Sequence, residues 1–307
     1  MVKYILKRLA LMVVTLFIVI TLTFFLMRAI PGGPFSFDRV IPPNVEAAMN
    51  AKYHLDQPLF VQYLDYLKAI LRFDFGPSFV YFGQTVNDMI SLGLPKSSQI
   101  GLLAIIVIVM IGLPLGITAA LNRNKWQDRT VMAISTIGVV VPSFVLATVM
   151  LYFFSIKLKL LPTFGLDNWK SYIMPVIALS IGSLSGVARL TRSSMLDVLN
   201  QDYIRTAYSK GLSNTRIVFV HVLRNSLIPV ITSLGMTFAA LLTGSFAVEK
   251  IYAIPGLGRY FVETISNRDY TAVMGLTILT AGIMVVAVFI IDIVYILIDP
   301  RIKLYKK

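Results

Sequence analysis

Six long apolar segments alternate with polar stretches along the chain. A helix needs about 20 predominantly apolar residues to cross the hydrocarbon core of a bilayer. The segments that meet or approach this length are Leu9–Ile30, Gln99–Leu121, Val131–Ile156, Ser171–Ala188, Leu227–Val248 and Thr271–Ile298. The fourth is short and rich in Ser and Gly, which suits close helix packing better than lipid contact. The pattern therefore predicts an all-α polytopic membrane protein with six transmembrane helices.

The composition agrees with this pattern and excludes several classes of site. Of the 307 residues, 57% are hydrophobic and only 14% are charged, whereas a soluble domain is about half apolar. The chain has no cysteine, and His54 and His221 are its two histidines. Disulfides, Cys-ligated zinc, iron–sulfur clusters and multi-histidine metal sites are therefore excluded. The apolar run after residues 1–8 is too long for a signal peptide, so we expect a retained span.

The basic residues predict which side of the membrane each loop occupies. Sixteen of the 28 Lys and Arg residues lie in 1–8, 122–130, 189–226 and 299–307, and 11 are spread over the longer segments 31–98, 157–170 and 249–270. The positive-inside rule then places both termini and the long segment 189–226 in the cytoplasm. The same rule accounts for the net charge of +13, so we expect no nucleic-acid partner.

The long outer segment Pro31–Ser98 is expected to contain two helical stretches, Asn44–Tyr53 and Pro58–Phe73. The second stretch places several apolar side chains on one side, namely Tyr63, Leu64, Leu67, Ile70 and Leu71. A helix of this kind is expected to lie along the membrane surface or over a pore mouth.

Two ionisable residues interrupt the spans, where such groups are costly. Arg28 lies near the outer end of the first span, and Asp292 lies roughly 9 Å from the inner end of the sixth. Because their depths differ, we expect them not to pair. Arg28 is expected to reach the outer headgroups, and Asp292 to have a structural role near the inner mouth or to meet a basic group of the cytoplasmic loop. Four prolines favour bends or hinges in the spans, namely Pro114, Pro142, Pro175 and Pro229.

No catalytic pattern accompanies the spans. The sequence lacks paired acidic residues on adjacent spans, a Ser–His pair, an HExxH motif and a Walker A loop. An intramembrane enzyme is therefore disfavoured, and the energy for any pumping must come from another subunit.

The cytoplasmic segment 189–226 is too long for an ordinary connector, so we expect it to be structured. Residues 189–200 continue the fourth span, and 203–210 form a short helix that Gly211 ends as a C-terminal cap. Ser213 then caps a second helix running to about residue 223. With Tyr203, Ile204 and Ala207 exposed, this hairpin is expected to dock into a groove of a partner protein. A solvated basic loop is the alternative.

The short helix carries a recognisable motif. Arg205-Thr206-Ala207-Tyr208-Ser209-Lys210-Gly211 resembles the EAA-loop signature of permease subunits of binding-protein-dependent ABC importers, in which Ala207 and Gly211 match and Arg205-Thr206 depart from the general pattern. The wider segment, with Tyr203-Ile204, Lys210-Gly211-Leu212 and His221, is similar to the peptide-importer branch.

Further motifs extend this resemblance along nearly the whole chain. They are Pro31-Gly32-Gly33-Pro34-Phe35, Lys52-Tyr53-His54-Leu55, Asp74-Phe75-Gly76-Pro77-Ser78, Pro142-Ser143-Phe144, Ile254-Pro255-Gly256-Leu257-Gly258, Asn267-Arg268-Asp269-Tyr270 and Asp299-Pro300. Their order and spacing resemble the B-type membrane subunit of oligopeptide permeases. Phe35 and its turn favour the oligopeptide branch over dipeptide or nickel relatives.

The resemblance implies a type I ABC importer permease fold in the cytoplasmic membrane of a bacterium. Residues 1–98 would form the first transmembrane helix plus an extracytoplasmic segment, 99–300 a five-helix core with the coupling loop 189–226, and 301–307 a cytoplasmic tail. The implied partners are a homologous second permease subunit, two cytoplasmic ATP-binding subunits, an extracytoplasmic peptide-binding protein and a peptide substrate. ATP and Mg would be bound by the ATPase subunits, with no cofactor in this chain.

The resemblance also implies two functional regions. The ATPase-coupling residues would be Tyr203, Ile204, Arg205, Thr206, Ala207, Lys210 and Gly211. The outer gate candidates are Glu249, Pro255, Gly256 and Gly258. Neutral polar residues of the fourth and fifth spans either face the pore or pack between helices, namely Ser180, Ser183, Ser185, Thr232, Ser233, Thr237, Thr243 and Ser245. The alternative functions are a dipeptide, nickel or other small-solute ABC permease, and a membrane scaffold or receptor that recruits a cytoplasmic partner without transport.

Overall fold

A computed structural model describes residues 2–30, 55–81 and 83–298, and within these ranges the chain is helical, with no strand beyond an isolated bridge between Pro77 and Thr85. The α-helices are α1 (Val2–Ala29), α3 (Leu59–Leu71), α4 (Val86–Val107), α5 (Leu113–Leu121), α6 (Trp126–Val140), α7 (Ser143–Met150), α8 (Ile173–Leu199), α9 (Asp202–Ser209), α10 (Asn214–Arg216), α11 (Leu223–Leu242), α12 (Phe246–Ile251), α13 (Leu257–Ser266) and α14 (Tyr270–Ile298). Short π-helical or 3₁₀ segments join some of them: Ile108–Gly112, Leu151–Lys157, Trp169–Tyr172 and Ile217–Val222. The all-α prediction is confirmed.

Among the described residues, five continuous helices are long and apolar enough to cross a membrane. They are Tyr4–Ala29, Val86–Leu121, Trp169–Leu199, Asn214–Ile251 and Tyr270–Val294. A sixth crossing exists if α6 and the helix that begins with α7 form one broken span. Five to six spans therefore agree with the six predicted apolar segments.

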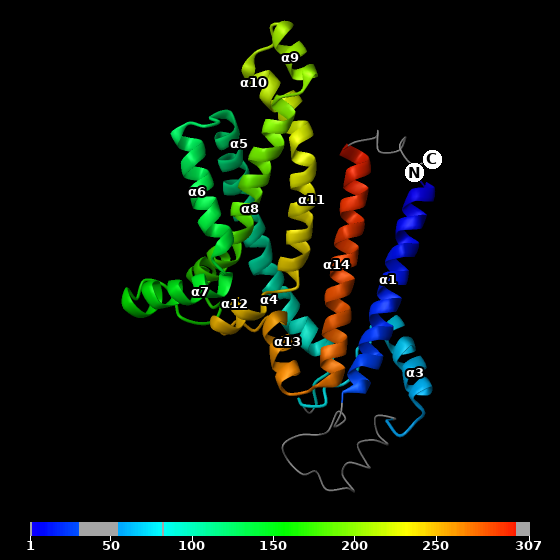
Figure 1. The fold of residues 1–307 in the computed structure, drawn as a ribbon. Helices are drawn as coiled ribbons and strands as arrows, with labels where there is room; N and C mark the ends of the chain where they lie inside the picture. Colours follow the sequence, from blue (N-terminus) through cyan, green and yellow to red (C-terminus); the bar gives the residue numbers. More distant parts are fainter. Residues whose placement is uncertain (1, 31–54, 82, 299–307) are drawn as a thin grey trace.

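The third predicted span, Val131–Ile156, bends at its proline as expected, and the bend of 96° between Val140 and Ser143 breaks it into two helices. Pro142 removes a backbone donor and forces the residue before it into extended backbone. Val141 accordingly has φ −75° and ψ 117°. As a result α7 runs sideways out of the bundle (Figure 1).

The other three prolines of the predicted spans cause no such break. Pro175 lies in the first turn of α8, where the missing N–H costs little. Pro114 follows the π-helical turn Ile108–Gly112, and Pro229 lies inside α11.

The second span begins 13 residues earlier than the predicted Gln99. A capping box fixes this start, since the Thr85 side chain accepts a hydrogen bond from the Asp88 N–H at 3.1 Å and the Asp88 carboxylate accepts one from the Thr85 N–H at 2.8 Å. The helix begins before the apolar run because its first turns pack against α13 and α14 instead of lipid.

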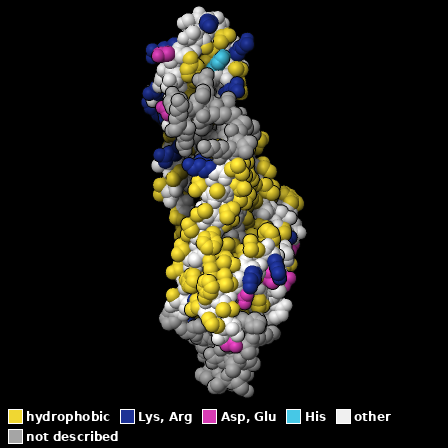
Figure 2. All heavy atoms as spheres, turned by 90° about the vertical axis from the view of Figure 1, so that its right-hand side faces the viewer, with side chains coloured by type: hydrophobic (Ala, Val, Ile, Leu, Met, Phe, Trp, Pro, Cys, Tyr) yellow, Lys and Arg dark blue, Asp and Glu magenta, His cyan; other side chains and the backbone are white. Residues whose placement is uncertain are grey.

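Helix α8 is the centre of the bundle and packs against α4, α5, α6 and α11. Helix α14 packs on α11, and α1 is attached to α14 at the edge of the bundle. The start of α1 and the end of α14 lie at the same end of the molecule as α9 and α10 (Figure 1). On the face formed by this edge, hydrophobic side chains form a broad band between charged residues nearer the two ends (Figure 2).

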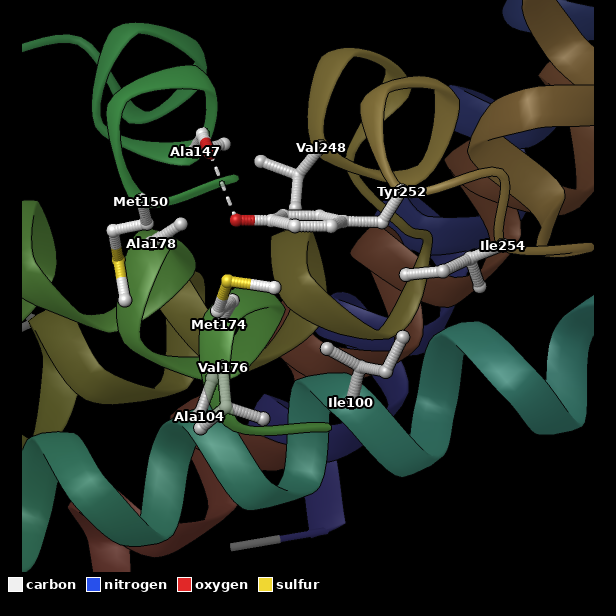
Figure 3. Close-up of a cluster of buried hydrophobic side chains, with 10 residues drawn as sticks. All are labelled: Ile100, Ala104, Ala147, Met150, Met174, Val176, Ala178, Val248, Tyr252 and Ile254. Atoms are coloured by element: carbon white, nitrogen blue, oxygen red, sulfur yellow. Dashed lines mark hydrogen bonds between the residues drawn. The ribbon is translucent and has the colours of Figure 1, made fainter. Parts of the chain in front are cut away.

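A buried cluster holds α12 against α7 and the start of α8 (Figure 3). Its largest side chain, Tyr252, is 2% exposed and donates a hydrogen bond to the Ala147 carbonyl at 2.9 Å. Burial raises the pKa of Tyr252, so its hydroxyl stays protonated as a donor. The sideways helix α7 is therefore anchored to the bundle.

The predicted helix Pro58–Phe73 is confirmed as α3, whereas Asn44–Tyr53 lies outside the described residues. Tyr63 is buried with Phe24 of α1 and Met274 of α14, and its hydroxyl is 2.7 Å from the Thr21 hydroxyl. Leu64 and Leu71, predicted on the same side, are exposed.

The two ionisable residues of the spans do not pair with each other. Asp292 forms an ion pair at 3.0 Å with Arg8 of α1. Of its two predicted roles, the one with a partner in the cytoplasmic loop is therefore wrong. The Arg28 guanidinium lies 5.2 Å from the centre of the Phe24 ring. The Arg8–Asp292 pair thus ties the edge helix α1 to α14.

Candidate functional site

The hairpin formed by α9, Gly211 and α10 projects from one end of the bundle (Figure 1). Gly211 has φ +74° and donates its N–H to the Tyr208 carbonyl at 2.9 Å. The Leu212 N–H bonds the Ala207 carbonyl at 3.3 Å. Glycine adopts this left-handed backbone at little cost, so the predicted helix cap at Gly211 is confirmed.

The predicted exposure of Ile204 and Ala207 is wrong. Ile204 is 0% and Ala207 7% exposed, and both pack against Met195, Ile217 and Val222 of the flanking helices. Residues three apart share one helix face, and here that face turns toward the chain itself. The residues of this segment that remain on the outside are Tyr203, Arg205, Thr206, Tyr208, Ser209, Lys210 and Gly211.

The segment 189–226 is not a loop between spans. Helix α8 extends unbroken to Leu199, and α10 continues through the π-helical turn into α11 without the predicted stop near residue 223. Ser213 stands at the N-cap of α10 but makes no side-chain cap bond. Helices α8 and α11 therefore both lead directly into the hairpin that contains α9.

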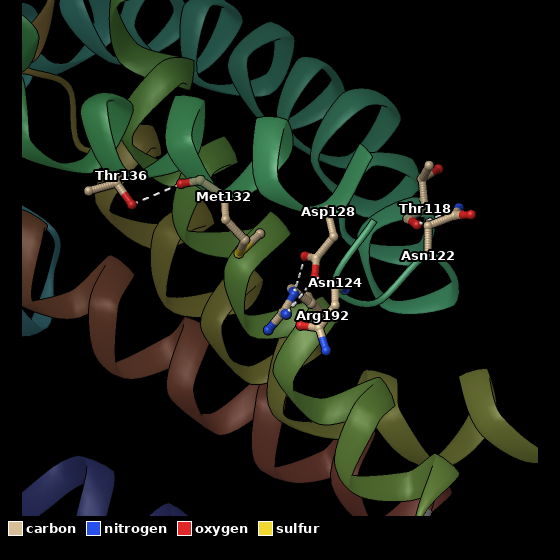
Figure 4. A network of polar contacts seen from close by, with 7 residues as sticks. All are labelled: Thr118, Asn122, Asn124, Asp128, Met132, Thr136 and Arg192. Carbon is tan, nitrogen blue, oxygen red and sulfur yellow. Dashed lines mark hydrogen bonds and ion pairs between the residues drawn. The ribbon is translucent and has the colours of Figure 1, made fainter. Parts of the chain in front are cut away.

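An ion pair fixes the same end of the bundle (Figure 4). The Arg192 guanidinium of α8 contacts the Asp128 carboxylate of α6 at 2.5 and 2.7 Å. Asp128 is 3% exposed and also accepts the Asn124 N–H at 2.9 Å. Sequence reasoning missed this pair, although an aspartate in the otherwise basic segment 122–130 was the available signal.

The predicted gate residue Glu249 lies buried at the start of α12, 2% exposed. Its carboxylate accepts hydrogen bonds from the Ser97 hydroxyl at 2.7 Å, the Ser245 N–H at 3.2 Å and the Arg259 N–H at 3.2 Å. The Ser97 hydroxyl accepts the Leu257 N–H at 2.9 Å. These bonds join α4, α12 and α13 at one point.

Three glycines make room for this carboxylate. A Cβ at Gly244 or Gly256 would overlap the Glu249 carboxylate, and one at Gly258 would lie 3.0 Å from Glu249 Oε2 and 2.8 Å from the Ser245 carbonyl carbon. Gly256 and Gly258 therefore lie against the Glu249 carboxylate, whereas Pro255, the remaining gate candidate, is exposed. Sequence reasoning missed Ser97, because the second span was predicted to begin at Gln99, two residues after it.

A second polar group lies on α13, beside the Glu249 site. The Glu263 carboxylate accepts the Arg259 Nε–H at 2.6 Å and the Tyr81 hydroxyl at 3.3 Å. Burial and the nearby Glu263 charge raise the pKa of Tyr81. The segment before α4 is thus linked to the helix that follows the predicted gate motif.

Two of the eight neutral polar residues considered for the pore, Ser183 and Ser245, line a cavity of about 590 Å³ beside the α6–α7 break. Ser180 instead bonds carbonyls at Val176 and Ala104, and Ser185 is 3% exposed. The hydroxyls of Thr232, Thr237 and Thr243 bond backbone carbonyls of the same helix.

Comparisons with known proteins identify the family. A family model described as "Binding-protein-dependent transport system inner membrane component" matches residues 112–304, and a model of the N-terminal part of such membrane components matches residues 1–90. The chain is 48% identical over 307 residues to the dipeptide transport system permease protein DppB of Bacillus subtilis (strain 168), with 100% of both chains covered. It is 44% identical over 305 residues to the oligopeptide transport system permease protein OppB of Salmonella typhimurium, covering 99% of this chain and 100% of the relative.

The fold has a counterpart among solved structures. A chain of the MetNI methionine ABC transporter, in an inward-facing conformation, matches with a TM-score of 0.58 at 20% identity. The match covers 67% of this chain and 94% of that one. The predicted type I ABC importer permease fold is confirmed.

Proposed function

Because the chain belongs to the family of binding-protein-dependent transport system inner membrane components, we propose that it is the permease subunit that forms, with a homologous second subunit, the pathway for ATP-driven uptake of oligopeptides. The observation that carries this proposal is full-length identity of 43–48% to peptide permeases. The protein is a multi-pass protein of the cell membrane, and peptide permease is its functional class. We further propose that both termini and α9 face the cytoplasm, as the basic residues favour.

The exposed side of α9 contacts one of the two cytoplasmic ATP-binding subunits, which hold ATP and Mg. Its members include Arg205, Thr206 and Lys210, and Gly211 sets the turn that presents them. Ile204 and Ala207 act from beneath, since their burial attaches α9 to α8 and α11. Closure of the ATPases moves α9, and the continuous helices carry that movement into the spans.

The Glu249 site is the outer gate. One carboxylate joins the segment 244–259 to α4 through Ser97, so the segment moves as a unit. Ser245 also lines the cavity beside the α6–α7 break, and this supports a gate at the edge of a space that a peptide can enter. An extracytoplasmic peptide-binding protein delivers the peptide to this side.

Uptake of labelled peptides of graded length tests the function. Vesicles containing the complete transporter and its binding protein are compared with vesicles that lack this subunit. Uptake of peptides of four or more residues that requires the subunit supports an oligopeptide permease. Uptake restricted to dipeptides would support the second candidate, which the 48% identity to a dipeptide permease favours. Absence of ATP-dependent uptake of any peptide would overturn the transport function and leave a scaffold.

A further inference from the structure

Two cavities meet along one side of the bundle. The first, of about 590 Å³, lies between the α6–α7 break, α8 and residues 240–247. The second, of about 540 Å³, lies farther along α6 and α8 toward the end that carries α9. Val139 lines both. We call the two together the α6–α8 groove. Their volumes fall in the range of ligand sites, about 300–1,000 Å³.

The wall that α8 contributes is open along one helix face. Gly182, Gly186, Arg189 and Ser193 line the groove at helical spacing. A Cβ at Gly186 would have no neighbour within 4 Å, and one at Gly182 would meet only the Gly138 carbonyl oxygen at 3.7 Å. Close helix packing therefore does not explain these two glycines.

The groove changes in charge along its length. None of the described residues that line the first cavity is charged, and its polar side chains are Ser143, Ser183 and Ser245. Two arginines line the second. Arg192 is neutralised by Asp128, whereas Arg189 is exposed and has no ion pair within the described part of the chain. The groove thus runs from neutral to cationic.

We propose that the α6–α8 groove carries the transported peptide past this subunit, and that Arg189 binds the peptide's C-terminal carboxylate. This inference rests on the proposed function. Peptides share a main chain and a terminal carboxylate while their side chains vary, so a permissive route needs neutral walls. The serine hydroxyls hydrogen-bond the main chain, and the guanidinium forms a charge-assisted bond with the carboxylate.

A third cavity has the opposite chemistry and supplies a control. It has a volume of about 640 Å³, lies among α1, α4, α11 and α14, and is almost wholly apolar. Gly282 of α14 lines it, and a Cβ there would also have no neighbour within 4 Å. Lipid chains suit this groove, and a peptide main chain does not.

Disulfide trapping tests the route, because the chain has no cysteine of its own. Gly186→Cys and Gly282→Cys are each placed in the complete transporter, which is supplied with binding protein, ATP and a peptide carrying an activated disulfide. We expect Gly186→Cys to capture the peptide at least tenfold more than Gly282→Cys. Equal capture, or a disulfide from Gly186→Cys to the second permease subunit, overturns the proposed route.

Uptake by charge variants tests Arg189. Uptake of one peptide is measured in two forms, with a free and with an amidated C-terminus. For each form, the uptake rate of Arg189→Gln or Arg189→Lys is divided by the wild-type rate, so that any preference of the binding protein for one form cancels. We expect Arg189→Gln to slow the free-carboxylate peptide about tenfold, Arg189→Lys to restore most of that rate, and the amidated peptide to respond to neither. An equal loss for both peptides overturns the carboxylate contact. Failure of the wild type to transport either peptide overturns the proposed function itself.

Discussion

The Ser97 hydroxyl on α4 donates a hydrogen bond of 2.7 Å to the Glu249 carboxylate on α12, across 152 residues of sequence. The same hydroxyl accepts the Leu257 N–H that begins α13. One serine therefore joins a membrane-spanning helix to both short helices, α12 and α13, of the proposed gate. A buried carboxylate is stable only when such donors surround it.

Removing that carboxylate should destabilise the protein. In Glu249→Ala, the Ser97 hydroxyl and the N–H groups of Ser245 and Arg259 lose their acceptor. Each unsatisfied buried donor costs about 1–3 kcal/mol, so we expect a clear fall in the thermal unfolding temperature in detergent. Glu249→Gln keeps one carbonyl oxygen, so its unfolding temperature should lie between those of the wild type and Glu249→Ala. An unchanged unfolding temperature in Glu249→Ala would contradict the assignment.

A methyl group at Gly256 should have a similar effect by steric means. Its Cβ would overlap the Glu249 carboxylate, so Gly256→Ala must displace the acceptor. We expect reduced peptide uptake and a lower unfolding temperature. Gly186→Ala is the matched control for stability, because it adds the same methyl group where no atom lies within 4 Å and Ala favours a helix over Gly by about 1 kcal/mol. A Gly256→Ala protein as stable as the control would refute a tight fit around the carboxylate.

The hydrophobic pattern predicted the fold well wherever contact with lipid or with the interior of the helix bundle requires apolar side chains. The apolar run of the sixth predicted span, for example, matches α14 within one residue at its start, Tyr270. The helix start at Val86 was missed because a capping box, and not hydropathy, sets it. The 96° turn at Pro142 was predicted only as a bend, because the packing of Tyr252 against α7 joins residues 105 positions apart.

The candidate sites were also predicted only in part, because contacts between residues far apart in the sequence cannot be read from local patterns. The turn at Gly211 follows from local backbone chemistry, so sequence was sufficient. The inward direction of Ile204 and Ala207 depends on Met195 and Val222, which belong to helices whose relative placement no local pattern specifies. Likewise the gate motif revealed Glu249, but its partner Ser97 lies on a different span.

Proline at position 211 should uncouple the ATPases. Proline holds φ near −65° and has no N–H, whereas Gly211 has φ +74° and donates to the Tyr208 carbonyl. We expect Gly211→Pro to lose peptide-stimulated ATP hydrolysis in the assembled complex while the subunit still inserts in the membrane. Gly211→Ala meets no neighbouring atom within 4 Å and bears only the cost of the left-handed backbone, roughly 1–2 kcal/mol, so it should retain most of the stimulation. Normal stimulation in Gly211→Pro would remove α9 from the coupling mechanism.

Breaking the Asp128–Arg192 pair should loosen α6 from α8 at the end that bears α9. In Asp128→Asn, Arg192 keeps its charge but loses its ion-pair partner and one of the two acceptor oxygens, and the Asn124 N–H loses a charged acceptor. Breaking a buried pair by removing one charge costs about 3–5 kcal/mol, and because Arg192 is 24% exposed we expect the lower part of that range. Asp65→Asn is the matched control, since the Asp65–Lys68 pair is 57% and 69% exposed and such pairs contribute about 0–1 kcal/mol. Denaturant unfolding of both variants in detergent measures the difference. Equal losses of unfolding free energy would mean that the buried pair does not hold α6 to α8.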